Sequence, residues 1–142
     1  WSHKYARRQW NLVDNKELDY HYLGDFDKEM LNVMKSERNF QNTKLQEIWH
    51  NDDDQILAYM RGDLLFVFNF NPTRSFTDYG FLVPTGSYDV VLNTDAKKFG
   101  GFGFTDDTMT HLTNYDQLYV DQHKEWLKLY IPARSAVVLK KN

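Results

Sequence analysis

The fold of this chain is decided by the segment Asp63-Leu64-Leu65-Phe66-Val67-Phe68-Asn69-Phe70-Asn71-Pro72. Because strand side chains alternate between two faces, the even-numbered apolar residues of this segment share one face, while Leu65 and Val67 share the other. A strand that is apolar on both faces is usually covered on both sides. Pro72 then ends the strand, because proline has no N–H for the hydrogen-bond ladder. The segment therefore predicts a central strand in a sheet.

Short segments of alternating apolar and polar residues lie on both sides of this strand. The predicted strands span 45–50, 55–61, 64–70, 87–93, 126–131 and 135–140, with a further short strand near 109–113. Residues 73–84 are predicted to be a longer crossing segment, and 94–107 a loop that contains glycine. Short strands separated by turns are typical of an antiparallel sandwich or an open barrel. We therefore expect a mainly β fold.

The first part of the chain has helical periodicity instead. Residues 2–12 contain good helix formers and no breaker, which predicts a first helix. Asp14 and Glu17 have the spacing of a capping box, which predicts a second helix that ends at Gly24. A third helix is predicted over 25–38.

A polar connector at 39–43 separates the helical pattern from the alternating one. We place a domain boundary there, with a helical segment at 1–43 and an all-β domain at 44–142. The chain begins with Trp1 rather than methionine and enters a helical pattern at once. We therefore expect it to be cut from a longer protein.

The composition argues against several classes of function. The 142 residues carry a net charge of -3 and no Lys/Arg-rich stripe, which argues against nucleic acid as a partner. The sequence has no cysteine, so it has neither disulfides nor thiolate chemistry, and this fits a reducing compartment. It contains no long apolar span and no signal peptide, so we expect no membrane partner and a cytoplasmic location. Its aromatic content is high, at 16 %.

None of the polar motifs has the spacing of an active site. The five histidines lack metal-ligand spacing, and Asp52–Asp54 lacks the alternating ligands of a calcium loop. The glycines of Phe99–Phe104 do not lie between a strand and a helix, as a phosphate cradle requires. Asp106 and Asp107 are adjacent and would not flank a glycosidic bond. The sequence therefore predicts no catalytic, metal-binding or cofactor-binding residue.

Aromatic side chains on strands and loops are the remaining candidates for ligand contact. Rings of this kind can stack on sugars, although each can equally serve to pack the core. The candidates for glucan contact are Trp49, Tyr79, Phe102, Phe104 and Trp126. From the residues alone, the chain is a helical segment followed by an auxiliary β domain.

Several segments, taken in order, resemble the C-terminal end of 1,4-α-glucan branching enzymes of the α-amylase superfamily (glycoside hydrolase family 13). They are Tyr5-Ala6-Arg7-Arg8-Gln9-Trp10-Asn11-Leu12, Phe26-Asp27-Lys28-Glu29-Met30, Leu64 to Pro72 with Ser75-Phe76-Thr77-Asp78-Tyr79, Leu92-Asn93-Thr94-Asp95 with Phe99-Gly100-Gly101, and Tyr130-Ile131-Pro132-Ala133-Arg134-Ser135-Ala136-Val137-Val138-Leu139. Each segment is weak alone, but their order and spacing cover nearly the whole chain. The run from Ser75 to Tyr79 looks more like the eukaryote-type enzymes.

This resemblance implies that residues 1 to about 40 end a catalytic (β/α)8 barrel, and that the rest is the family's Greek-key-like C-terminal sandwich. The family transfers α-1,4-glucan segments to 6-hydroxyls and so forms α-1,6 branches in glycogen biosynthesis. Its catalytic aspartate and glutamate lie in barrel motifs upstream of Trp1, so the fragment alone should be inactive. The implied partners are the barrel and α-glucan (glycogen or starch-like chains).

Two alternatives stay open. One is a free-standing carbohydrate-binding β module that uses exposed aromatic residues. The other is the C-terminal domain of another α-amylase-family hydrolase, which would lack the segment Arg7-Arg8-Gln9-Trp10. We also expect the isolated fragment to expose an apolar patch near Tyr5 and Trp10 and to self-associate.

Overall fold

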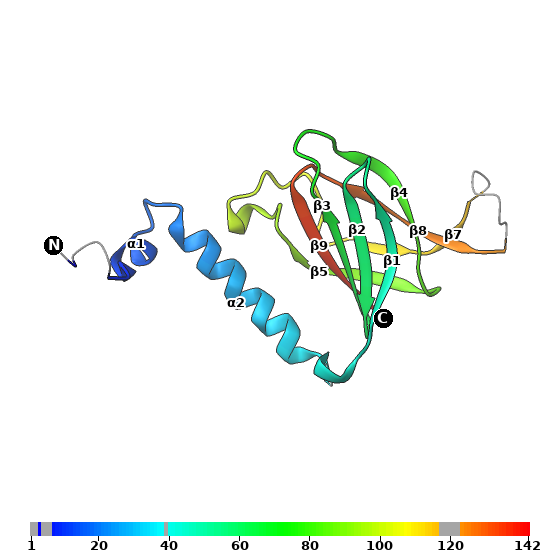
Figure 1. Ribbon diagram of the computed structural model, residues 1–142, viewed down its shortest axis with the longest axis horizontal. Helices are drawn as coiled ribbons and strands as arrows, with labels where there is room; N and C mark the ends of the chain where they lie inside the picture. Colours follow the sequence, from blue (N-terminus) through cyan, green and yellow to red (C-terminus); the bar gives the residue numbers. More distant parts are fainter. Residues whose placement is uncertain (1–2, 4–6, 39, 117–122) are drawn as a thin grey trace.

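Two antiparallel β-sheets form a sandwich that carries two helices on one side (Figure 1). The computed structural model describes residues 3, 7–38, 40–116 and 123–142. The mainly β, antiparallel fold predicted from the sequence is confirmed. Among the described helices, none has the length and apolar character needed to cross a membrane.

The larger sheet has six strands and the smaller sheet three, in the orders β1-β2-β3-β9-β5-β6 and β4-β8-β7. The strands are β1 (Leu45–Asn51), β2 (Ile56–Arg61), β3 (Leu64–Asn69), β4 (Phe76–Leu82), β5 (Ser87–Asn93), β6 (Thr110–Leu112), β7 (Asn114–Tyr115), β8 (Glu125–Ile131) and β9 (Ser135–Lys141). All described pairings are antiparallel. The predicted strands are therefore present, and β6 lies where the short strand near 109–113 was expected.

β3 is the central strand that its sequence predicts, paired with β2 on one side and β9 on the other. Leu65 and Val67 point into the core between the sheets, with Phe81 of β4 and Leu127 of β8. Leu64, on the opposite face, belongs to a second apolar cluster beneath the long helix. Both faces of β3 are apolar because one is covered by the second sheet and the other by a helix.

Two of the described strands were missed from the sequence, the two-residue β7 and the longer β4. The segment predicted to cross between sheets, 73–84, contains β4, which pairs with β8. Phe81 is fully buried in the core, so the pairing and the burial hold this segment in a strand. Thr77 and Asp78 interrupt its alternation with an irregularity in register, and this is why the pattern did not indicate a strand.

The helices differ from those predicted. α1 (Trp10–Asp14) and α2 (Tyr20–Ser36) replace the three predicted helices, with short 3-10 turns η2 (Phe40–Asn42) and η3 (Lys97–Phe99). Residues 2 and 4–6 of the predicted helix 2–12 lie outside the described residues, and 7–9 are not helical. Asp14 ends α1 instead of capping a helix. Gly24 and Asp25 lie inside α2 instead of separating two helices.

Tertiary packing explains why α2 continues through Gly24. A glycine inside a helix costs about 1 kcal/mol relative to alanine, which is less than burying a large side chain contributes. Phe26, Met30 and Val33 of α2 pack against the cluster on the outer face of the larger sheet. A side chain at Gly24 would also meet α1, since its Cβ would lie 3.7 Å from Val13.

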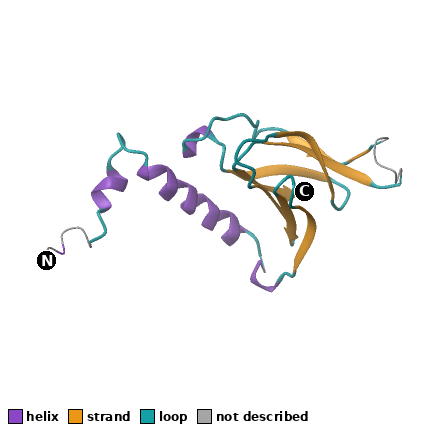
Figure 2. Ribbon diagram, turned by 45° about the horizontal axis from the view of Figure 1, so that its top comes forward, coloured by secondary structure: helices purple, strands orange, loops and turns teal. Residues whose placement is uncertain are grey.

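α2 lies beside the sheets (Figure 2). Ion pairs and a ring contact also link α2, and Glu37 directly after it, to η3 and β9. Lys98 Nζ lies 2.8 Å from the Glu29 carboxylate, and Lys140 Nζ lies 2.6 Å from that of Glu37. Phe99 of η3 contacts Phe26 edge-on, with ring centroids 5.2 Å apart. The domain boundary at 39–43 stays a prediction, and α2 packs on the sheet that follows it.

Candidate functional site

A groove lies where the outer strands of the two sheets, β1 and β4, come together beside β8. It encloses about 420 Å³ and is lined by Trp49, Thr77, Asp78, Tyr79, Gly80 and Trp126. Three of the five aromatic residues predicted for glucan contact are therefore brought together here, from positions far apart in the sequence. We call this surface the seam groove.

Hydrogen bonds orient two of the rings in the seam groove. Trp49 Nε1 donates to the Tyr79 hydroxyl at 3.1 Å, and that hydroxyl donates to Asp54 Oδ2 at 3.0 Å. The other carboxylate oxygen of Asp54 lies 3.4 Å from the Arg74 guanidinium. Asp54 therefore has a positioning role that the sequence did not indicate. Asp54 lies in the turn between β1 and β2, and its hydrogen-bond partner Tyr79 lies 25 residues further along the chain.

Irregularities in the strand backbone lie next to Trp49 and Tyr79. The register of β1 shifts between Glu47 and Trp49, and that of β4 shifts between Phe76 and Tyr79. Bulges of this kind redirect side chains and are common beside functional sites. Asp78 has a positive φ of 51°, which is uncommon for a residue other than glycine. Both ring-bearing positions thus follow a break in the regular ladder.

The other two aromatic candidates, Phe102 and Phe104, form a separate pair in the loop that follows η3. Their rings stack with centroids 5.4 Å apart and are 69 % and 64 % exposed. The buried Asp95 carboxylate accepts the backbone N–H groups of Phe102, at 3.1 Å, and Phe104, at 2.6 Å. Gly101 is required here, because an added Cβ would lie 2.2 Å from the Asp95 carbonyl oxygen. The loop adjoins α2, while β4 and β8 lie on the far side of the molecule (Figure 1).

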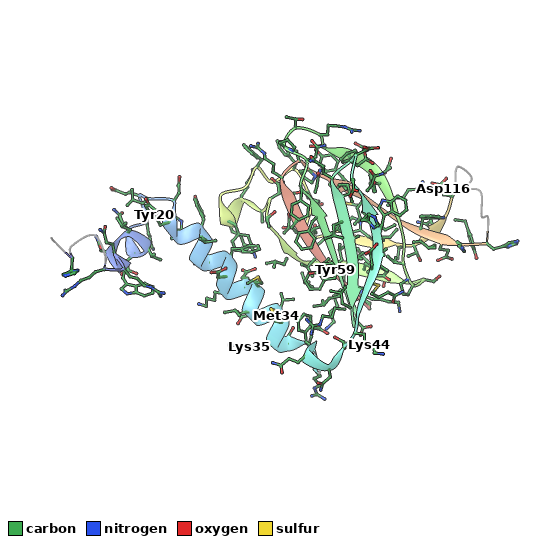
Figure 3. All side chains as sticks on the ribbon, in the orientation of Figure 1. Tyr20, Met34, Lys35, Lys44, Tyr59 and Asp116 are labelled. Atoms are coloured by element: carbon green, nitrogen blue, oxygen red, sulfur yellow. The ribbon has the colours of Figure 1, made fainter. Side chains whose placement is uncertain are left out.

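A second cavity, also of about 420 Å³, lies between α2 and the outer face of the larger sheet. Met34 of α2 and Tyr59 of β2 line it, as Figure 3 shows. Tyr59 stacks on Phe66 with centroids 4.8 Å apart, and burial raises its pKa. The lining of this cavity is almost wholly apolar. The cavity therefore offers space for apolar side chains but few polar groups for catalysis or ligand binding.

Asp106 and Asp107 each accept a hydrogen bond from another side chain. Asp106 accepts hydrogen bonds from the amide and hydroxyl of Thr108, which lower its pKa, whereas a general acid needs a raised one. Asp107 accepts a hydrogen bond from Asn93 at 2.7 Å. No cluster of His, Asp or Glu within the described ranges could hold a metal ion.

The chain is similar to known proteins over nearly its whole length. Residues 48–142 match the family described as the alpha amylase C-terminal all-beta domain. Among curated proteins, the 1,4-alpha-glucan-branching enzyme of Candida glabrata is 41 % identical over 140 residues, which is 97 % of this chain and 19 % of that protein. Those of Saccharomyces cerevisiae and Rhizophagus irregularis are 38 % and 37 % identical, again over 97 % of this chain and 20 % of each relative. The chain matches a small C-terminal part of these enzymes.

Proposed function

Since this chain belongs to the family of the alpha-amylase C-terminal all-beta domain, we propose that it is the non-catalytic C-terminal part of a 1,4-α-glucan-branching enzyme. The observation that carries the proposal is the match of 97 % of the chain to about a fifth of several such enzymes. The match includes the helical segment, which a free-standing binding module would not need. The seam groove is the observation that favours a free-standing carbohydrate-binding module, because it offers a surface for contact with glucan.

In this proposal the longer protein transfers α-1,4-glucan segments to 6-hydroxyls in glycogen biosynthesis, in the cytoplasm. A covalent glycosyl-enzyme forms on an aspartate, and a glutamate serves as acid and base. Both carboxylates belong to the catalytic barrel, and no residue of this chain takes either role. The 142-residue chain is therefore inactive by itself.

The chain's own role is to support the barrel through the outer face of its helices. Trp10 of α1 is 63 % exposed, and Tyr20 and Leu23 of α2 are 59 % and 68 % exposed. Figure 3 places Tyr20 at the end of α2 far from the sheets. Exposed apolar surface of this kind typically marks an interface. We call Trp10, Tyr20 and Leu23 the helical face, and its occupant in this proposal is the barrel.

A charge placed on the helical face tests this role. In the full-length protein, Leu23→Asp buries an unpaired carboxylate against the barrel, at a cost of several kcal/mol. We expect a clear loss of thermal stability and branching activity. The matched control is Leu112→Asp on β6, where the side chain is 60 % exposed and should tolerate the charge.

Two results would overturn the proposal. One is branching of amylose by the 142-residue chain alone, measured by the iodine-stain spectrum. The other is a full-length Leu23→Asp protein that is as stable and as active as the Leu112→Asp control.

A further inference from the structure

We propose that the seam groove binds a chain of α-1,4-linked glucose at a distance from the reaction site. The ligand class rests on the proposed function, while the site itself rests on the geometry of Trp49, Tyr79 and Trp126. β4, β8 and β7 lie on the side of the sandwich away from α1 and α2 (Figure 1). The groove therefore stays open when the helical face is covered by the barrel.

The groove combines the two kinds of contact that a sugar needs. Trp49 is 46 % exposed, and Tyr79 and Trp126 are each partly exposed, so their rings can pack against the C–H face of a pyranose. Thr77 and Asp78 are exposed on the same groove and offer a hydroxyl and a carboxylate to sugar hydroxyls. The volume of about 420 Å³ lies in the range of small-molecule sites and suits a short run of glucosyl units.

The polar groups favour a sugar over an apolar protein surface. An apolar partner would strip water from the Asp78 carboxylate without replacing its hydrogen bonds, which is costly. Sugar hydroxyls can donate to this carboxylate, so its desolvation is offset. The lining also disfavours an anionic ligand, because no described basic side chain in the groove is available to pair with it.

The rings are held in place before any ligand arrives. The relay from Trp49 through Tyr79 to Asp54 restricts both side chains, and Arg74 in turn holds Asp54. Fixing side chains in advance lowers the entropy cost of binding. Asp78, with its positive φ, lies in the same groove. Backbone strain of this kind often occurs at functional sites.

The test is affinity electrophoresis of the 142-residue chain in native gels with and without glycogen. We expect glycogen to retard the chain, and Trp49→Ala to weaken retention at least about fivefold, as expected for an aromatic anchor. Tyr79→Phe keeps the ring but removes the relay, so its retention should be intermediate. The matched control is Trp10→Ala, which removes an exposed tryptophan from the helical face and should leave retention unchanged. Phe102→Ala should also leave it unchanged.

Each result decides for or against the groove, provided that circular dichroism shows the variants to be folded. Absence of retardation, equal retention of Trp49→Ala and Trp10→Ala, or a loss with Phe102→Ala alone would overturn the proposal. So would a full-length Trp49→Ala protein destabilised in the same way as Leu23→Asp, because the groove would then be a protein interface. Retention that depends on Trp49, in a protein that tolerates Leu23→Asp, would support the groove while refuting the proposed barrel support.

Discussion

At the scale of single residues, the buried Asn69 side chain lies within hydrogen-bond distance of four backbone groups. It is 2 % exposed, and its side-chain amide nitrogen lies 2.9, 3.2 and 3.0 Å from the carbonyls of Arg74, Ile131 and Pro132. Its side-chain oxygen accepts the N–H of Asn71. One side chain thus ties the end of β3 to the β8–β9 turn and to the approach to β4.

We expect Asn69→Ala to lower the free energy of unfolding by about 3 kcal/mol, since buried carbonyls lose their donor. Urea denaturation followed by circular dichroism measures this. Asn114→Ala, at an exposed position of β7, is the control and should change stability by less than about 0.5 kcal/mol. Equal midpoints for the two variants would show that the Asn69 network contributes little.

His111 on β6 makes stability depend on pH. Burial lowers its pKa below 6.5, and this outweighs Asp89 and Asp106, which raise it. As the pH falls below 6.5, the unfolded chain takes up a proton that the folded chain does not, so stability is lost. His50 acts in the opposite direction, because its hydrogen bond to Glu47 raises its pKa.

The measurement is the melting temperature of wild type and His111→Gln between about pH 7.5 and about pH 5.5. The wild type should lose more stability toward acid than the variant, in which His50 is unchanged. Parallel curves for the two proteins would contradict this account of His111.

At the scale of elements, α2 is stabilised by what it packs against rather than by its own sequence. Its apolar residues contact the outer face of the larger sheet, and the interruption at Gly24 does not end it. The sequence places β3 correctly for the related reason that both faces of that strand are apolar. An element is predictable when the pattern of its own apolar residues shows which of its faces are buried, as in β3. It is harder to predict when contacts with a distant segment stabilise it, as in α2 and β4.

Gly24→Ala should therefore stabilise the chain by up to about 1 kcal/mol, because helix propensity improves and the new methyl meets Val13 only at an ordinary contact distance of 3.7 Å. Gly101→Ala is the contrasting variant, since its Cβ would lie 2.2 Å from the Asp95 carbonyl oxygen. Thermal melts should shift upward for the first and downward for the second. A downward shift for Gly24→Ala would indicate that α1 packs more tightly on α2 than the structure shows.

At the scale of the whole molecule, the helical face leaves large apolar side chains exposed to solvent. Tyr5, one of the residues from which self-association was predicted, lies outside the described residues, but Trp10 and Leu23 are strongly exposed. In the 142-residue chain alone, these side chains are exposed to water and are free to contact another copy of the chain.

We expect the isolated 142-residue chain to self-associate as its concentration rises, because association buries exposed apolar surface. Leu23→Asp should shift the equilibrium toward monomer, and Leu112→Asp should not. Size-exclusion chromatography with light scattering distinguishes these outcomes. If the chain stays monomeric at every concentration, the prediction that the helical face mediates self-association is wrong.

The sequence by itself determined the mainly β, antiparallel fold, the central position of β3 and the set of aromatic candidates for glucan contact, because alternation and residue type are local properties. Only the tertiary structure decided which aromatic residues meet. Trp49, Tyr79 and Trp126 converge because β1 and β4 are the outer strands of two sheets packed together, while Phe102 and Phe104 project elsewhere from a loop built on Asp95. Sheet pairing and register depend on contacts between segments that are distant in the sequence, and local periodicity does not indicate these contacts.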